Sequence, residues 1–269
     1  AQAVGRNGGG ALFNGRGVNV IADKCLFANN SSDESASGSS KGGGAIGTTG
    51  SGGSFLFTNC TFYGNSAALG RGGAIYTGMD CKVINCTFTG NRAFNGGGFY
   101  GHNAGKMYTL INTICYNNID ENETGDIRRN NGDFTIYNCL ATVVSPALAE
   151  NFDSNGNILT TPAMKVFEND AAPELKDNGG NTLTVALHAT QSMAAKAGTA
   201  TAPAGIDVTI PTVDQRGYTR AAKPCMGAFE LGGIEPVGIQ TATADAKFNY
   251  SVEKGRLVIA ESGECRIFN

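Results

Sequence analysis

The amino-acid sequence predicts an all-β fold, a right-handed, single-stranded parallel β-helix with a short C-terminal β appendage. Three observations predict it: a motif that recurs along the chain, short strand-like runs between its copies, and abundant glycine. Aligned on the motif, the copies begin at residues 24, 59, 85, 112 and 138, so the steps are 35, 26, 27 and 26 residues. A period in this range indicates stacked repeats.

The repeated motif is an Asn-Cys pair followed by an aromatic residue and a further asparagine. Full copies run over 59–65 and 85–91, and related copies begin at Lys24 and Asn112. The longest step contains a polar insert, residues 31–40, which we expect to form an exposed loop.

Short runs rich in β-branched and aromatic residues lie between the motifs, and no helical periodicity of useful length accompanies them. Glycine accounts for 39 of 269 residues and proline for only 7, which favours many tight turns between short strands. Stacked coils of this kind advance about 4.8 Å per turn, so eight or so turns would form a rod of about 40 Å. The runs expected to form strands are Val18–Ile21, Phe55–Phe57, Cys81–Ile84, Tyr108–Ile111 and Phe134–Tyr137.

Equivalent residues of successive coils stack directly, which predicts ladders of like side chains. We expect side-chain amide hydrogen bonds along one series: Asn59, Asn85, Asn112 and Asn138. We expect small, buried apolar side chains along a second series: Cys25, Cys60, Cys86 and Cys139. A second set of asparagines follows the strands, where asparagine tolerates a left-handed turn: Asn30, Asn65, Asn91 and Asn118. Three phenylalanines are expected to stack inside: Phe27, Phe62 and Phe88.

Two short motifs alternate in register. Gly-Gly-Ala-Ile occurs at 43–46 and 72–75, and Phe-x-x-Asn occurs at 27–30, 62–65 and 88–91. Together they resemble the repeats of polymorphic outer-membrane proteins and related secreted β-helix adhesins. This resemblance implies a secreted protein at the bacterial cell surface, in the cell outer membrane.

The C-terminal half carries a different combination of motifs. Asp177-Asn-Gly-Gly precedes Thr182-Leu-Thr-Val-Ala-Leu, and Asp214-Gln-Arg-Gly-Tyr-Thr-Arg precedes Gly227-Ala-Phe-Glu. In this order they resemble the choice-of-anchor Q family of bacterial surface β-helix proteins, over residues 1–231. Residues 232–269 resemble a linker and the beginning of a type IX secretion sorting domain, which serves export and surface attachment. Three short strands are expected there, at 246–250, 256–259 and 265–268.

Both ends of the predicted coil stack need cover, because a bare end exposes core and unpaired backbone. Three residues suit a capping salt-bridge network over the last turn: Asp214, Arg216 and Arg220. The first turn, 8–13, has no obvious polar cap, and we expect upstream sequence or assembly with another subunit to cover it.

The repeats do not carry the residues that known β-helix chemistry requires. Lyases of the pectin-lyase type need acidic residues on neighbouring turns to hold Ca²⁺, and glycosidases need paired carboxylates. Equivalent positions here hold Asn, Thr and Cys, and the only histidines are His102 and His188. Calcium is the one candidate cofactor, through the acidic loop that contains Asp120, Glu121, Glu123 and Asp126. We expect this loop to be solvated rather than to form a calcium site, because the full calcium-loop spacing is missing.

A formal charge of −3 and the lack of a long apolar run predict neither nucleic-acid binding nor a transmembrane segment. We therefore expect a structural or adhesin-like surface protein that binds a glycan or a protein partner without catalysis. Two alternatives stay open: a carbohydrate-active enzyme of the lyase or glycosidase type, whose loops would be 31–40 and 120–126, and a subunit of a larger surface assembly.

Overall fold

The computed structural model contains two compact units, Ala1–Glu235 and Pro236–Asn269. The described residues are 2–4, 8–15, 17–33, 42–48, 50, 52–122, 125–236, 250–253 and 256–259. Most of the polar insert at 31–40 lies outside them.

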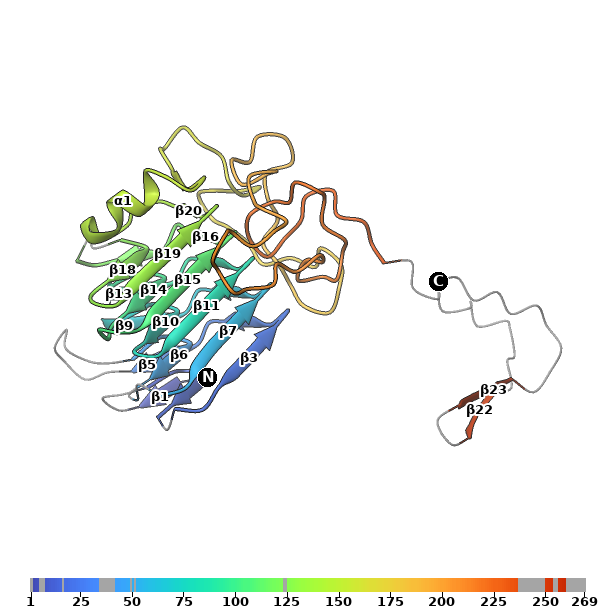
Figure 1. The fold of residues 1–269 in the computed structure, drawn as a ribbon, viewed down its shortest axis with the longest axis horizontal. Helices are drawn as coiled ribbons and strands as arrows, with labels where there is room; N and C mark the ends of the chain where they lie inside the picture. Colours follow the sequence, from blue (N-terminus) through green and yellow to red (C-terminus); the bar gives the residue numbers. More distant parts are fainter. Residues whose placement is uncertain are drawn as a thin grey trace. The chain divides into compact units, whose positions relative to one another are not determined.

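The first unit is built from four parallel sheets, each of which takes one strand from every coil (Figure 1). Sheet 1 contains β1 (Gln2–Val4), β5 (Ser31–Asp33), β9 (Ser66–Arg71), β13 (Arg92–Asn95) and β17 (Ile119–Asp120). Sheet 2 contains β2 (Leu12–Asn14), β6 (Ile46–Thr48), β10 (Ile75–Thr77), β14 (Phe99–Gly101) and β18 (Ile127–Arg129). Sheet 3 contains β3 (Val20–Asp23), β7 (Ser54–Thr58), β11 (Asp80–Ile84), β15 (Met107–Ile111) and β19 (Asp133–Tyr137). Sheet 4 contains β4 (Leu26–Ala28), β8 (Thr61–Tyr63), β12 (Thr87–Thr89), β16 (Ile114–Tyr116), β20 (Leu140–Ala141) and β21 (Ile158–Leu159).

The chain visits the four sheets in turn, which confirms the prediction of a parallel β-helix. All five runs expected to be strands overlap strands of sheet 3, each of which has four or five residues. The described residues form five coils rather than the expected eight, because regular coiling ends near Leu159. The rest of the unit folds along the side of the stack instead of lengthening it (Figure 1).

Aromatic side chains stack inside the coils in strict register. Phe27, Phe62 and Phe88 lie on successive strands of sheet 4, and their ring centroids are 4.8 Å and 4.5 Å apart with nearly parallel planes. This confirms the predicted phenylalanine stack. Beyond Phe88 the same position holds Cys115, which is also fully buried.

Glycines allow the corner between sheets 1 and 2, where successive coils approach closely. A Cβ atom on Gly73 would lie 1.9 Å from the carbonyl oxygen of Gly97, and one on Gly44 would lie 2.0 Å from that of Gly73. These distances are far shorter than any real contact, so only glycine fits there. The recurring Gly-Gly pair thus has a steric cause.

Two short helices close the C-terminal end of the coil stack: η1 (Pro146–Leu148) and α1 (Ala149–Phe152). Leu148 and Phe152 are buried in the same hydrophobic cluster as the coil interior. These helices have three and four residues, so no helix in the described part of the chain is long enough to span a membrane.

Residues 160–235, which we call the lateral segment, run in an irregular path along the side of the stack (Figure 1). They pack on the outer face of sheet 4 through a second hydrophobic cluster, in which Phe167, Leu187 and Met226 meet Ile114 and Leu140. Sheet 4 is therefore covered on both faces.

The second unit contains an antiparallel hairpin of β22 (Tyr250–Glu253) and β23 (Arg256–Ile259). The expected strand at 256–259 is present, and the one expected at 246–250 is described from Tyr250 onward. The third expected strand, 265–268, lies outside the described residues.

Candidate functional site: a groove on sheet 3

The outer face of sheet 3 is only partly covered. Residues 206–213 of the lateral segment cross it near β11 and β15, where Ile210 packs on Ile84 and Ile111 in a small hydrophobic cluster. Toward β3 the same face is open, and Ile21 is 74% exposed. The crossing segment and the open strands form the two sides of a groove.

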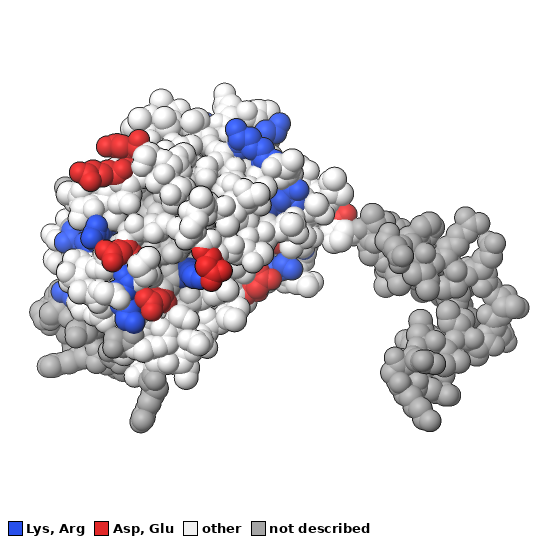
Figure 2. All heavy atoms as spheres, viewed as in Figure 1, with Lys and Arg blue, Asp and Glu red and all other residues white. Residues whose placement is uncertain are grey.

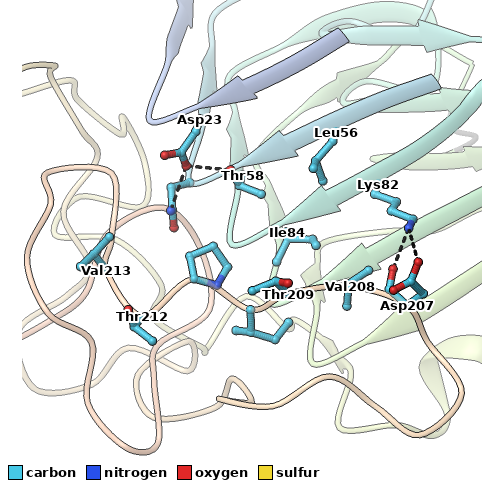
Figure 3. A pocket seen from close by; sticks show the side chains of 13 residues that line it. Asp23, Leu56, Thr58, Lys82, Ile84, Asp207, Val208, Thr209, Thr212 and Val213 are labelled. Carbon is cyan, nitrogen blue, oxygen red and sulfur yellow. Dashed lines mark hydrogen bonds and ion pairs between the residues drawn. The ribbon is translucent and has the colours of Figure 1, made fainter. Parts of the chain in front are cut away.

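The groove has a volume of about 530 Å³ and lies between sheet 3 and the crossing segment (Figure 3). Leu56, Thr58 and Ile84 line it from the sheet, and residues 207–213 line it from the opposite side. Leu56 and Thr58 of β7 both face the groove, because a strand presents every second residue to one face, and the crossing segment adds aliphatic and hydroxyl side chains from the opposite side. A cavity of this size suits a small ligand or one segment of a chain.

Charged groups mark the two ends of the groove, Asp23 at one end and Lys82 at the other (Figure 3). The Asp23 carboxylate accepts hydrogen bonds from the Thr58 hydroxyl at 2.7 Å and from the Asn59 amide at 3.2 Å. The Lys82 ammonium donates to the carbonyl oxygen of Asp207 at 2.6 Å. Both groups are held in place by protein partners.

A second hollow of about 270 Å³ continues along the sheet and shares Leu56 and Lys82 with the groove. It reaches Ile21 on β3 and Met107 on β15, and half of the Met107 surface is exposed. The accessible surface therefore extends across four neighbouring coils.

A buried ionic network fastens the lateral segment beside the groove. Arg220 is 8% exposed and donates to Glu230 at 3.1 Å, to the carbonyl oxygen of Gly227 at 2.8 Å and to the side-chain oxygen of Asn59 at 3.1 Å. Arg216 forms an ion pair with Asp214 at 2.8 Å. Its guanidinium also lies 3.9 Å from the centre of the Phe229 ring.

This network does not lie over the last coil, where the sequence led us to expect it. Arg220 reaches Asn59 of the second coil, and the neighbouring Gln215 accepts a hydrogen bond from Thr61 of the same coil at 2.5 Å. Asp214, Arg216 and Arg220 thus tie the lateral segment to the side of the stack. The last coil is closed by η1 and α1, whose apolar side chains fill the open core.

The first asparagine series lies in the turns between sheets 3 and 4. Asn59, Asn85, Asn112 and Asn138 all have φ angles between 49° and 54°. Among their side chains, one direct hydrogen bond links neighbours, from Asn112 to Asn85 at 2.8 Å. Further bonds of this series reach the lateral segment: the Asn112 amide also donates to the carbonyl oxygen of Thr199, and the Asn138 amide donates to that of Ala197. These left-handed turns present amides that hold the lateral segment.

The second asparagine series forms the continuous ladder. Asn30, Asn65, Asn91 and Asn118 lie on successive coils, and each of the first three donates its side-chain amide to the next side-chain oxygen at 2.8–2.9 Å. The two asparagine series thus have the opposite roles to those predicted from the sequence. Position relative to the turn decides the role, and the residue type does not reveal it.

The cysteines of the series lie inside the coils as free thiols. Cys60, Cys86 and Cys139 are fully buried, whereas Cys25 in the first coil is partly exposed. The Cys60 backbone N–H points at the Cys86 sulfur at 3.4 Å. Burial raises the pKa of the Cys139 thiol to about 12, so this thiol stays protonated and unreactive.

The acidic loop does not bring its carboxylates together in the described residues. Asp120 accepts the Gly96 N–H at 2.7 Å, and Glu121 pairs with Arg92 at 2.5 Å. Asp126 is buried at the bottom of a hollow of about 360 Å³ that Asp120 also lines, and Glu123 lies outside the described residues. No cluster of three metal-ligating side chains occurs within the described ranges.

Asp126 ends the asparagine ladder. Its carboxylate accepts hydrogen bonds from the backbone N–H groups of Asn118 at 3.1 Å, Thr142 at 2.8 Å and Val143 at 3.2 Å. Burial raises the pKa of Asp126 to about 6, against the opposing effect of these donors. Its hydrogen bonds therefore hold together the coil end at which the ladder stops.

Charges on the surface are sparse and mixed in sign. The face shown in Figure 2 carries acidic and basic side chains side by side, without a broad area of one sign. His102 lies against the Tyr76 ring at 5.3 Å, and His188 accepts the Gln191 N–H at 3.2 Å.

Sequence reasoning did not identify the groove residues. Leu56 and Lys82 are outward positions of strands that were expected, but residues 207–213 come from a segment with no strand pattern. Aliphatic side chains at outward positions, such as Ile21 and Leu56, were the available signal for a binding face.

Comparison with known proteins gives one finding. A family model described as the Chlamydia polymorphic membrane protein repeat matches residues 59–78, which include one Phe-x-x-Asn and one Gly-Gly-Ala-Ile motif. No curated protein and no solved structure matches the chain significantly. The resemblance to polymorphic outer-membrane protein repeats is confirmed over this coil, and a repeat of this type points to a bacterial outer-membrane or surface protein.

Proposed function

We propose that the protein is a secreted cell-surface β-helix that binds a glycan in the groove of sheet 3 without chemical change. One observation carries the proposal: a preformed groove of about 530 Å³ lies on the open part of a rigid parallel sheet. The repeat match supports the surface location.

The groove lining suits a sugar chain. Sugar rings present C–H faces and hydroxyl groups, and the groove offers aliphatic contacts beside hydroxyl side chains such as Thr58, Thr209 and Thr212. Asp23 and Lys82 at the ends supply one strong acceptor and one strong donor, which fix the orientation of a ligand.

The carboxylates of the groove are not arranged for hydrolysis. Glycosidases need two carboxyl groups that flank a single bond, whereas Asp23 and Asp207 lie at opposite ends of the groove (Figure 3). Asp23 is also engaged by Thr58 and Asn59. Binding without cleavage is therefore the function that this geometry supports best.

We also propose that the chain belongs to the choice-of-anchor Q proteins and that residues 232–269 take part in type IX export or attachment. The ordered motifs of the C-terminal half support the first proposal, and the hairpin β22–β23 supports the second. Deletion of 232–269 in a type IX-competent host would then retain the protein inside the cell, as measured by surface labelling.

A glycan array followed by calorimetry tests groove binding. The protein should retain a defined set of oligosaccharides, and Leu56→Gln and Thr209→Tyr should weaken binding about tenfold by removing apolar contact or filling the groove. Leu69→Gln is the matched control, because Leu69 is 49% exposed on β9 of sheet 1.

Two results would contradict the proposal. Equal binding by the groove variants and the wild type would place the glycan elsewhere. Release of shortened or unsaturated products from the bound oligosaccharide would show an enzyme instead of a binding protein.

A further inference from the structure

A row of polar side chains lies on the outer face of sheet 2, away from the groove; its two tyrosines are buried and its arginine is half-buried. Tyr76 of β10, Tyr100 of β14 and Arg128 of β18 occupy the same position on successive coils. The two tyrosine rings have centroids 5.6 Å apart. The row therefore places a guanidinium at one end of a pair of adjoining, mutually tilted rings.

A second row lies beside it, on the other side of the glycine corner. Arg71 ends β9, and it is in register with Asn95 on the next coil. Asn122 on the following coil donates to the Asn95 side-chain oxygen at 3.0 Å. The Arg71 guanidinium lies 5.5 Å from the centre of the Tyr100 ring, so the two rows are in contact. We call these six residues the arginine–tyrosine patch.

The arginines of the patch differ from the others. Six arginine side chains are described, and four of them form ion pairs: Arg92, Arg129, Arg216 and Arg220. Arg71 and Arg128 have no carboxylate partner among the described residues. Both unpaired guanidinium groups thus belong to this one surface.

Two guanidinium donors of the patch, Arg71 Nε and Arg128 Nε, lack a hydrogen-bond partner, and the Tyr76 hydroxyl, which lies beside the donor Arg71, has no acceptor for its own proton. Tyr76 is only 1% exposed, so water does not satisfy its hydroxyl. Burial raises the pKa of Tyr76, with Arg71 acting in the opposite direction, and the hydroxyl stays a proton donor. Buried donors without acceptors destabilise a protein unless a bound ligand supplies the missing acceptors.

We propose that the arginine–tyrosine patch binds an acidic glycan, whose carboxylate or sulfate groups pair with Arg71 and Arg128. A guanidinium binds such groups through two parallel hydrogen bonds, and stacking on tyrosine holds its plane in place. Arg71 and Arg128 lie two coils apart, about 10 Å along the stack. The Arg71 guanidinium reaches over Tyr100 of the intervening coil, so neighbouring anionic groups of one linear chain can reach both guanidinium groups.

A glycan fits the patch better than an acidic membrane does. Asn95 and Asn122 extend the Arg71 row with amide groups suited to sugar hydroxyls. A membrane surface is instead recognised by clusters of four to eight basic residues, and this chain has a net charge of −3. The site is separate from the groove, so the two proposals stand or fall independently.

Binding of defined polymers tests the proposal. Calorimetry at low salt should detect binding of alginate or chondroitin sulfate oligosaccharides and none of neutral dextran oligosaccharides. Arg71→Gln and Arg128→Gln should each weaken binding about tenfold or more. Arg92→Gln is the matched control, because it removes the same charge from an arginine already paired with Glu121. Arg128→Lys should fall between the wild type and Arg128→Gln, because lysine keeps the charge and loses the fork.

Circular dichroism of each variant should match the wild type, which separates lost binding from lost folding. The proposal fails if both patch variants bind acidic oligosaccharides as well as the wild type, or if Arg92→Gln loses as much affinity as they do. It also fails if anionic phospholipid vesicles bind through Arg71 and Arg128 while the oligosaccharides do not. The groove variant Leu56→Gln should leave this binding unchanged, so failure of one site is distinguishable from failure of the other.

Discussion

Replacing Arg220 with methionine should strongly destabilise the first unit. The guanidinium makes five hydrogen bonds, of which one goes to the Glu230 carboxylate, one to Asn59 of the second coil and three to backbone carbonyl groups. Both charged side chains are at most 2% exposed. Methionine fills a similar volume but leaves Glu230 as a buried charge without a cation, at a cost of about 3–5 kcal/mol in the free energy of unfolding.

A double-mutant cycle separates the ion pair from the packing. Arg220→Met and Glu230→Gln are measured singly and together by urea denaturation, monitored by far-ultraviolet circular dichroism. The double variant should regain part of the free energy of unfolding that Arg220→Met loses, because it contains no unpaired buried charge. Arg92→Met is the surface control, since its pair with Glu121 is about half exposed and contributes about 0–1 kcal/mol. A cost below about 1 kcal/mol for Arg220→Met would refute the view that this network fastens the lateral segment.

Three further predictions concern the stack itself. Asn91→Leu removes four side-chain hydrogen bonds from the middle of the ladder and should cost about 3 kcal/mol in urea denaturation, whereas Asn151→Leu, outside the ladder, should cost less. Gly73→Ala forces a Cβ to 1.9 Å from a carbonyl oxygen and should prevent the coils from closing, seen as loss of cooperative thermal unfolding. The pKa of Asp126 is raised from 3.8 to about 6, so wild-type stability should fall by up to about 3 kcal/mol as pH rises through that window, and Asp126→Asn should flatten this part of the pH profile.

The pH prediction follows from the direction of the shift. A raised pKa means that the folded protein binds the Asp126 proton more tightly than the unfolded chain does. The contribution favours folding below the unfolded pKa and is lost as pH rises through the folded value. The prediction is contradicted if, between pH 4 and pH 6, the free energy of unfolding of the wild type rises relative to that of Asp126→Asn.

The parallel coil and its inner stacks could be predicted from the sequence because they depend on periodicity. Phe27, Phe62 and Phe88 recur at one position, and parallel register brings like residues together. The sheet 3 strands were found for the same reason. The two asparagine series were distinguished wrongly, because both combine an amide with tolerance of left-handed backbone, and only the turn geometry separates them.

The groove and the arginine–tyrosine patch could not be predicted, because both join residues from segments with unrelated patterns. The groove needs residues 207–213, whose path over sheet 3 is fixed by packing of Ile210 and by the Arg220 network rather than by any repeat. The patch needs the glycine corner to bring Arg71 against Tyr100, two residues 29 positions apart. Local periodicity carries no information about either contact.

Methyl-resolved NMR of the protein labelled at isoleucine, leucine and valine tests the central claim most directly. Titration with an oligosaccharide retained on the array should shift the methyl signals of Leu56, Ile84, Val208 and Ile210 together, with the oligosaccharide intact at the end. Shifts confined to other parts of the molecule, or a cleaved oligosaccharide, would contradict the assignment of the sheet 3 groove as a binding site without chemistry.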